Sequence, residues 1–199
     1  MKQLAALLVL TLAGSCPAAA PSVFYYTSSP TAFTGMGETR LLIPADGYFF
    51  SGFKYESQGS NTNAFSFEVE DNPLDPGHEF WFLRFVGPNF SNLTPGFYGD
   101  AQRWPFQQPG HPGLSFSGNG RGSGTLTGEF KVLEVSFSGA TVKSFAVDFM
   151  QYDRGFPSQW NYGSFRYHSD IPITPLPEPH AAALSLIAAF LWPRRSHRR

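Results

Sequence analysis

The chain has 199 residues and a net charge of −1; only 15% of its residues are charged, while 17% are aromatic. This length suits one domain with a sizeable core. Between residues 22 and 175, fourteen acidic residues face nine basic ones. A basic surface interleaved with aromatics, which nucleic acid requires, is therefore excluded from the body, and no nucleic-acid partner is expected.

The first 19 residues have the three parts of a secretory signal peptide. Lys2 supplies a positive charge, Leu4 to Ala13 form a short apolar core, and small residues follow. We expect export through the Sec machinery and cleavage by signal peptidase after Ala18 or Ala19.

Cys16 leaves a second interpretation of this segment open. The run Leu12-Ala13-Gly14-Ser15-Cys16 is a loose lipobox, in which the cysteine would carry a lipid. With ordinary cleavage the only cysteine leaves with the signal, so the mature body has neither disulfides nor a thiol. It then holds together by packing alone.

The body, residues 22–169, has the pattern of a β protein. Aromatic and β-branched residues recur at short intervals between Gly, Pro and Asn turns, and no segment keeps a helical period over three turns. We predict a single all-β domain of about eight to eleven strands, an antiparallel β-sandwich or jelly roll. The expected strands are 23–27, 39–43, 48–55, 64–70, 80–86, 125–137, 141–152 and 162–169, with at most two short ones, 96–101 and 114–117, in the irregular region 87–124.

Two strands carry more detailed predictions. The segment 80–86 is apolar on both faces apart from Arg84, which predicts a central strand covered on each side. In the longest strand the alternation slips by one residue near Val132 and Leu133, which predicts a β-bulge there. This strand is expected to form a hairpin with the next one.

The end of the chain has four parts. Residues 170–176 are rich in proline and predict an extended spacer that lifts the domain off a membrane. Pro177-Glu178-Pro179 follows, kept extended by its prolines. An apolar run from Ala181 to Trp192 then partitions into lipid, and basic residues hold the end in the cytoplasm. These basic residues are Arg194, Arg195, Arg198 and Arg199.

This order of parts over residues 177–199 resembles the PEP-CTERM sorting tail of exported proteins of Gram-negative bacteria. The resemblance implies that an exosortase-type enzyme recognises Pro177-Glu178-Pro179 and processes the tail. It also implies a location in the cell envelope or extracellular matrix, with transient anchoring in the inner membrane. As a helix the apolar run is roughly 18 Å long, against roughly 30 Å of hydrocarbon, so it suits transient anchoring better than a permanent span. The alternative is a C-terminal amphipathic helix.

A second resemblance concerns the body. A β module that recurs in exported bacterial proteins, and has no assigned activity, is similar to segments 95–101, 105–107, 113–122, 125–128 and 163–167, together with Arg103. The resemblance implies that relatives carry a cysteine pair near Ser123 and Asp153, where this chain has none. Loss of both cysteines together would be expected if the loops around these two residues are neighbours.

The best candidate site is a group of polar and aromatic residues in the predicted loops. Aromatic rings pack on the apolar C–H faces of sugars, and arginine forks and amides reach sugar hydroxyls or a uronate. The alternative is that the tryptophans fill the ends of a sandwich and Arg121 ties down a Gly-rich turn. The candidate glycan-binding residues are Arg103, Trp104, Gln107, Asn119 and Arg121, with Phe106 and Gln108 beside them, and with Trp160 and Tyr162 if the last loop lies nearby.

Metal-binding and catalytic patterns are weak in this sequence. Asp71, Asp75 and Glu79 are spaced closely enough for a calcium loop, but the intervening prolines favour a solvated acidic loop. No histidine spacing is typical of a metal site, and no nucleophile with a positioned base stands out. We expect no metal, no cofactor and no catalytic residue.

The sequence thus predicts an exported, non-catalytic cell-surface or extracellular-matrix protein that is sorted by an exosortase-type system and associated with the exopolysaccharide of a biofilm. A glycan-binding, lectin-like module is the first alternative. A glycan-active enzyme is the second, and it requires two carboxylates that face each other in one cleft.

Overall fold

The computed structural model describes residues 20–56 and 62–176. The predicted signal peptide, 1–19, and the predicted sorting tail, 177–199, lie outside these ranges. Apart from two short 3-10 helices, the regular elements described are all strands, so the predicted all-β class is confirmed. The strands are β1 (Val23–Ser28), β2 (Thr39–Leu42), β3 (Phe49–Lys54), β4 (Phe65–Glu70), β5 (Phe80–Val86), β6 (Gly96–Arg103), β7 (Gly113–Gly118), β8 (Arg121–Gly122), β9 (Leu126–Ser138), β10 (Thr141–Asp153) and β11 (Trp160–Tyr167), and the 3-10 helices are η1 (Pro44–Asp46) and η3 (Pro88–Phe90). Among the described residues, a helix with the length and apolar character of a membrane span is not found.

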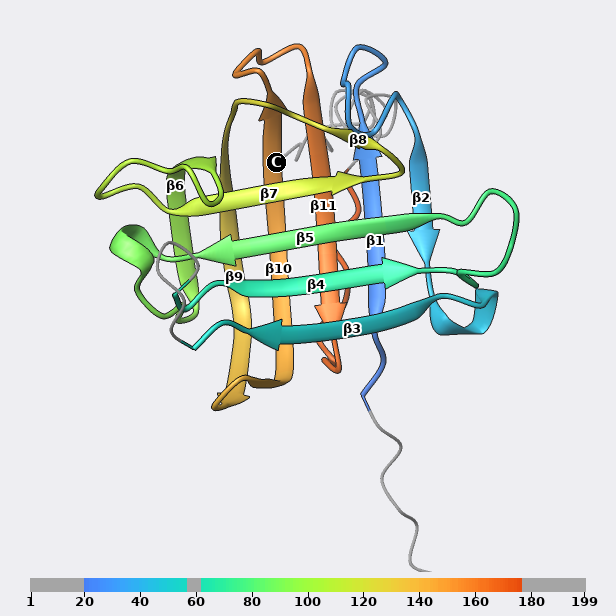
Figure 1. The fold of residues 1–199 in the computed structure, drawn as a ribbon, viewed down its shortest axis with the longest axis horizontal. Helices are drawn as coiled ribbons and strands as arrows, with labels where there is room; N and C mark the ends of the chain where they lie inside the picture. The colour runs from blue at the N-terminus through green and yellow to red at the C-terminus, as the bar shows by residue number, and fades with distance from the viewer. Residues whose placement is uncertain (1–19, 57–61, 177–199) are drawn as a thin grey trace, which may run out of the picture.

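The strands form two layers that cross each other (Figure 1). β3, β4, β5 and β7 make the front layer, and β6, β9, β10, β11, β1 and β2 run behind them. The layers are joined where Thr141 of β10 pairs with Phe53 of β3, and where the end of β6 pairs with the start of β7. The β6–β7 pair is parallel, so the sheet is mixed. The sequence had predicted a wholly antiparallel arrangement.

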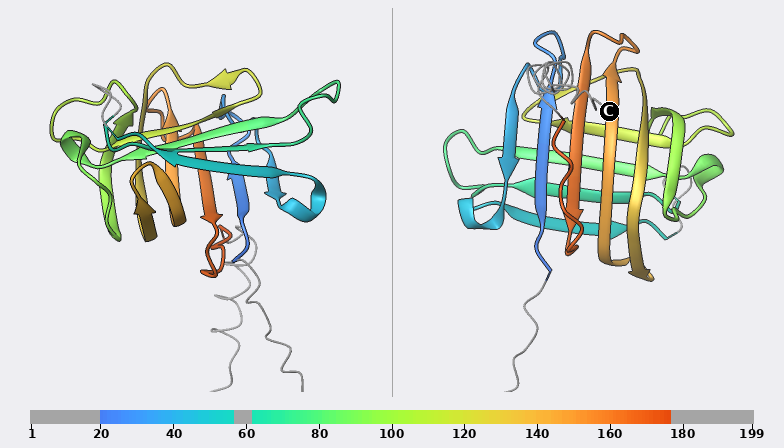
Figure 2. Two further views of the ribbon diagram at one scale, coloured as in Figure 1. Left: turned by 60° about the horizontal axis from the view of Figure 1, so that its bottom comes forward. Right: turned by 180° about the vertical axis from the view of Figure 1, so that it is seen from behind.

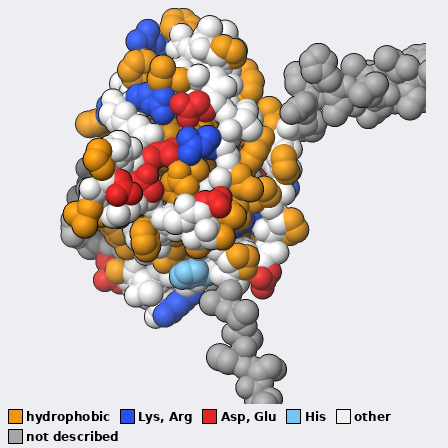
Figure 3. Space-filling model, turned by 90° about the vertical axis from the view of Figure 1, so that its right-hand side faces the viewer, with side chains coloured by type: hydrophobic (Ala, Val, Ile, Leu, Met, Phe, Trp, Pro, Cys, Tyr) orange, Lys and Arg blue, Asp and Glu red, His pale blue; other side chains and the backbone are white. Residues whose placement is uncertain are grey.

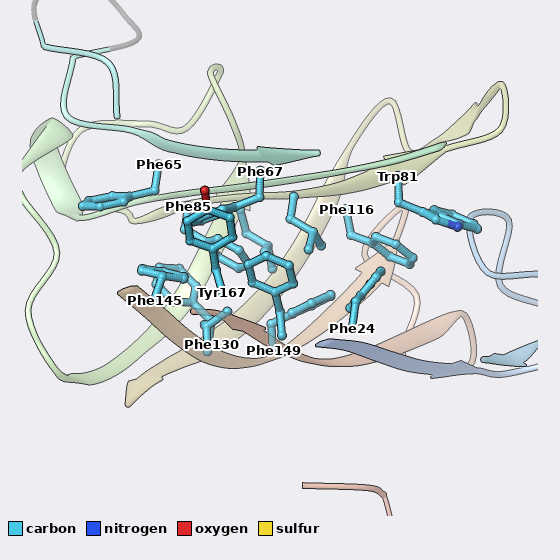
Figure 4. Close-up of a cluster of buried hydrophobic side chains, with 14 of the residues drawn as sticks. Phe24, Phe65, Phe67, Trp81, Phe85, Phe116, Phe130, Phe145, Phe149 and Tyr167 are labelled. Atoms are coloured by element: carbon cyan, nitrogen blue, oxygen red, sulfur yellow. The ribbon is translucent and has the colours of Figure 1, made fainter. Parts of the chain in front are cut away.

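Aromatic side chains fill the space between the layers. Successive residues of a strand point to opposite faces, so each strand sends alternate side chains into the core. Figure 4 shows rings of the front layer pointing at rings of the back layer. Phe116 lies 5.7 Å from Phe24 and 5.6 Å from Phe149, measured between ring centroids. Such pairs contribute roughly 0.5–1.5 kcal/mol each beyond their buried area, which supports a body without disulfides.

The predicted bulge near Val132 and Leu133 is confirmed. Val132 pairs with Val147 and Glu134 pairs with Ala146, which leaves Leu133 as the extra residue of β9. The predicted hairpin of β9 and β10 is present as well, with pairing along almost the whole of both strands.

Two predictions about the middle of the chain differ from the structure. Residues 87–124 contain three strands, β6, β7 and β8, and not at most two. β5 lies inside the front layer, but only Trp81, Leu83 and Phe85 enter the core, together with Val86 at its end. Phe80, Phe82 and Arg84 stay partly exposed on the outer face, because no second layer covers that side.

The proline-rich residues 170–176, here called the C-terminal strap, do not extend away from the body as predicted. They return along the outer face of β11, as the rear view in Figure 2 shows. Thr174 N donates to Ser164 Oγ at 3.0 Å, and Tyr162 Oη donates to Thr174 O at 2.5 Å. Prolines lack an N–H but keep the carbonyl acceptor, so side chains of β11 hold this segment without strand pairing.

Candidate functional site

The outer face of the front layer forms the floor of a groove. Arg84 of β5 stands opposite Ser115 of β7, and Phe82 stands opposite Ser117. Since all four have the parity that points away from the core, they share this face. Serine hydroxyls and one arginine are thus placed side by side on a partly aromatic surface.

Loops complete the groove on two sides. The residues at the end of β6 form one wall, and the glycine-rich residues from Gly122 of β8 to Gly124 form the other. The depression between them has a volume of about 280 Å3. We call it the arginine groove, and it is lined by Arg84, Arg103, Trp104, Pro105, Ser115, Ser117, Gly122, Ser123 and Gly124.

Trp104 is a half-buried wall of this groove and not an exposed platform. Its ring stacks on Tyr55 at a centroid distance of 6.0 Å, and the guanidinium carbon of Arg84 lies 5.1 Å from its centroid. Its indole Nε1 is buried and has no hydrogen-bond partner among the residues that the structure describes. Because two neighbours already pack on the ring, Trp104 offers the groove a wall more than a free face for a sugar.

Arg84 is held between aromatic rings. Its guanidinium carbon lies 4.8 Å from the Phe82 centroid, in addition to its contact with Trp104. Burial lowers the pKa of the guanidinium, and Tyr55 and Glu68 oppose this shift. The guanidinium forms a side-chain hydrogen bond with Tyr55, while its Nε is buried without a hydrogen-bond partner in the described part of the chain. The group is therefore a partly desolvated cation with donor capacity to spare.

Arg103 forms the second positive charge of the groove. Its guanidinium carbon lies 4.9 Å from the Phe106 centroid, and its Nη1 donates to Gly124 O at 3.2 Å. Within residues 20–56 and 62–176, neither Arg103 nor Arg84 forms an ion pair with a carboxylate. The groove is lined by cations without acidic residues.

The other sequence-predicted residues lie elsewhere. Gln107 is buried, with 8% of its surface exposed, and packs beside Gly113. Asn119 Oδ1 accepts the Phe80 N–H at 2.8 Å, which fixes the turn after β7. The Arg121 side chain lies over Trp81, at 5.3 Å from the ring centroid, and approaches Glu38 at 3.5 Å. Asn119 and Arg121 thus hold the turn and the end of the core.

Trp160 and Tyr162 do not join the groove. Both belong to β11 in the back layer, and the Tyr162 ring packs edge-on against Tyr25 at 6.5 Å while its hydroxyl holds the strap. They share the outer face of that layer, opposite to the face that carries the groove. The structure therefore keeps Arg103 and Trp104 together, with Phe106 beside Arg103, and places Asn119, Arg121, Trp160 and Tyr162 elsewhere.

Sequence reasoning missed Arg84, Ser115 and Ser117. The signal for Arg84 was present, since it is the single charge in the otherwise apolar segment 80–86. The serines alternate with Leu114 and Phe116 in the manner of a half-exposed strand. Their meeting depends on the pairing of β5 with β7, which local pattern does not reveal.

A cluster of charged side chains lies on the side of the molecule that carries β2 and the loop between β4 and β5 (Figure 3). Glu79 accepts hydrogen bonds from Tyr48 Oη at 2.6 Å, Arg40 Nη2 at 2.8 Å and Trp81 Nε1 at 2.8 Å. Burial alone would raise the pKa of Glu79, but these bonds and the Arg40 charge lower it. Burial, together with Glu79, raises the pKa of Tyr48 to about 12.

Glu38 belongs to the same side. Its Oε2 accepts a hydrogen bond from Tyr26 Oη at 2.7 Å, and burial followed by this bond raises the pKa of Tyr26. Glu38 and Glu79 are therefore both engaged by donors of the protein and tie β2 and its neighbours to the front layer.

The acidic loop after β4 is tied to its own backbone. Asp71 Oδ1 lies 2.8 Å from His78 Nδ1 and accepts the Glu79 N–H at 2.9 Å, while Asp75 Oδ1 accepts from Asn72 Nδ2 at 3.1 Å. In the described part of the chain, no group of three or more histidine, cysteine or acidic side chains is placed to hold a metal ion.

The loops around Ser123 and Asp153 are neighbours in the structure, which is the condition under which both cysteines would be lost together. The backbone N–H of Arg154, the residue after Asp153, donates to Ser123 Oγ at 2.9 Å. This contact anchors the wall of the arginine groove to the loop between β10 and β11.

No protein-family model, curated protein or solved structure matches the chain.

Proposed function

We propose that this chain is an exported, non-catalytic cell-surface or extracellular-matrix protein. In this proposal residues 1–19 direct secretion, and an exosortase-type enzyme processes residues 177–199 while the tail anchors the protein transiently in the inner membrane. The folded cargo is a sandwich-like β body of jelly-roll type. The proposal is supported above all by the order of Pro177-Glu178-Pro179, apolar run and arginines after a β body whose core packs without disulfides.

The test is the intact mass of the protein recovered from its native host. We expect a product that has lost residues 1–18 or 1–19 and the residues after the tripeptide. Replacing Pro177-Glu178-Pro179 by three alanines should leave the tail attached. Ile173→Ala, a change in the strap just before the tripeptide, should still lose the tail. A cytosolic product that retains both Met1 and Arg199 would contradict the proposal.

A second candidate function, binding of polysaccharide, is favoured by the arginine groove. The groove combines two arginines, three serines and a half-buried tryptophan in a shallow depression on a rigid sheet, which is the kind of donor set that reaches sugar hydroxyls. Affinity electrophoresis in gels containing polysaccharide from the host matrix tests it. The protein should migrate more slowly there than in a plain gel, and an unchanged mobility would argue against binding.

A further inference from the structure

We propose that the arginine groove binds the anionic groups of an acidic polysaccharide, carboxylate or sulfate, with Arg84 and Arg103 as the anion-binding residues. The inference rests on the proposed polysaccharide contact and adds the class of the ligand. Ser115 and Ser117 face the ring hydroxyls in this arrangement, and Trp104 forms the wall.

The distribution of charge on the sheet face supports an anion. Arg84 and Arg103 line the groove, and its nine lining residues include no carboxylate. Glu68 and Glu70 lie on the same face but on β4, one strand further from β7 than Arg84. The face is therefore polarised, with its positive end in the groove, although the body as a whole is acidic. A local cluster of one sign recruits ligands of the opposite sign.

The unmet hydrogen-bonding capacity of the groove points the same way. Arg84 Nε and Trp104 Nε1 are buried donors without a partner among the described residues. Tyr55 forms a side-chain hydrogen bond with the Arg84 guanidinium, but Nε itself stays unpaired, and a buried donor left unpaired is costly. Anionic oxygens are the strongest acceptors for a guanidinium, which binds carboxylate and sulfate in a forked arrangement.

The arginines are also held ready for a ligand. Arg84 is packed between Phe82 and Trp104, and Arg103 is held by the Phe106 ring and by Gly124 O. Side chains that are already fixed lose little conformational entropy on binding. A flexible pair of surface arginines would bind an anionic chain with less geometric selectivity.

Affinity electrophoresis of the purified full-length chain separates the possibilities. The gels contain polygalacturonate, dextran sulfate or neutral dextran, and the variants are Arg84→Gln and Arg103→Gln. Lys143→Gln is the matched control, because it removes the same charge from an exposed position on β10. Thermal unfolding of each variant shows whether it is folded. If Arg84→Gln does not fold, Arg103→Gln, on the wall of the groove, still tests the proposal.

We expect retardation by the acidic polymers that exceeds retardation by dextran, that weakens with added salt, and that falls by about tenfold in binding constant in each groove variant. Lys143→Gln should behave as the parent protein. Equal retardation by neutral and acidic polymers, or equal loss in Lys143→Gln, overturns the acidic ligand while polysaccharide binding stands. No retardation by any polymer, including the host matrix polysaccharide, overturns both proposals.

Discussion

Arg166 donates to the carbonyl oxygen of Pro172 from two nitrogens, Nε at 3.1 Å and Nη2 at 2.8 Å. Its Nη1 forms an ion pair with Asp148 Oδ1 at 3.0 Å, and the side chain has no exposed surface. The buried guanidinium of Arg166 on β11 therefore binds the strap, and the carboxylate of Asp148 on β10 compensates its positive charge. Pro177 follows directly on Leu176, so the predicted sorting tripeptide comes straight after a docked segment.

The first prediction concerns the contact between Arg166 and the strap. Arg166→Met should lower the free energy of unfolding by about 3 kcal/mol, because it leaves Asp148 without its ion-pair partner and removes the donors that hold the strap. Urea denaturation measures the loss. Limited proteolysis should show faster cleavage within residues 170–176.

Arg154→Met provides the control for Arg166→Met. Arg154 is exposed and forms no ion pair within the described residues. Arg154→Met should therefore change the free energy of unfolding by less than about 0.5 kcal/mol. An Arg166→Met protein whose strap stays as protected as in the parent would contradict the role assigned to the guanidinium.

The second prediction concerns the contact of Gly163 with Phe149 in the core. These residues face each other on β11 and β10, and a Cβ on Gly163 would clash with the Phe149 ring. Gly163→Ala should therefore destabilise the protein by roughly 1–3 kcal/mol. Adding Phe149→Leu should recover part of that loss in a double-mutant cycle.

Gly124→Ala is the matched substitution for Gly163→Ala. A Cβ there would meet no atom within 4 Å, so thermal unfolding should be nearly unchanged. If both variants lost the same stability, the ring contact would not be the cause.

The third prediction concerns pH and Glu79. The pKa of this carboxyl is lowered below its usual 4.5 in the folded protein, so its contribution to stability is complete above pH 4.5 and is lost as pH falls below it. Glu79→Gln should be less stable by about 1–3 kcal/mol at pH 7. The difference from the parent should shrink on acidification below pH 4.5.

Urea denaturation between pH 3 and pH 7 measures this difference. Asp71, whose pKa is also lowered, mainly through its hydrogen bond with the Glu79 backbone, adds its own pH dependence to both proteins, so only the difference between them reports Glu79. Glu129→Gln, at an exposed position of β9, is the control. A parent–variant difference that stayed constant down to pH 3 would refute the assignment.

The fourth prediction separates the two contributions of Trp104. Trp104→Ala should lower the free energy of unfolding by about 1–3 kcal/mol, since the ring packs on Tyr55 and Arg84. Trp104→Phe keeps a ring but removes the Nε1–H, so it should stay close to the parent in thermal unfolding. Its retention by acidic polysaccharide should still weaken if the indole donor faces the ligand. Full stability of Trp104→Ala would show that the ring does not support the groove.

Much of the strand pattern was visible in the sequence because it is local. Alternating side chains identify a strand from a few neighbouring residues, and the slip at Val132 and Leu133 marked the bulge for the same reason. The parts of the C-terminal tail are also contiguous, so their order could be recognised without a fold.

The candidate site was only partly visible. Arg103 and Trp104 are neighbours in the chain, so their grouping survived folding, whereas Trp160 and Tyr162 were assigned to the same cluster and lie on the other layer. Sequence proximity to a loop does not say which layer a strand joins, because pairing between distant strands decides it.

The sequence by itself determined that this is an all-β body without disulfides between two signal-like ends, since periodicity, composition and short motifs are properties of neighbouring residues. The tertiary structure alone decided that Arg84 faces Ser115 and that Arg166 receives the strap. The first contact requires β5 to pair with β7, and the second requires the chain to turn back along β11 after that strand ends. The burial of Arg84 likewise exists only once Trp104 has folded over the outer face of β5.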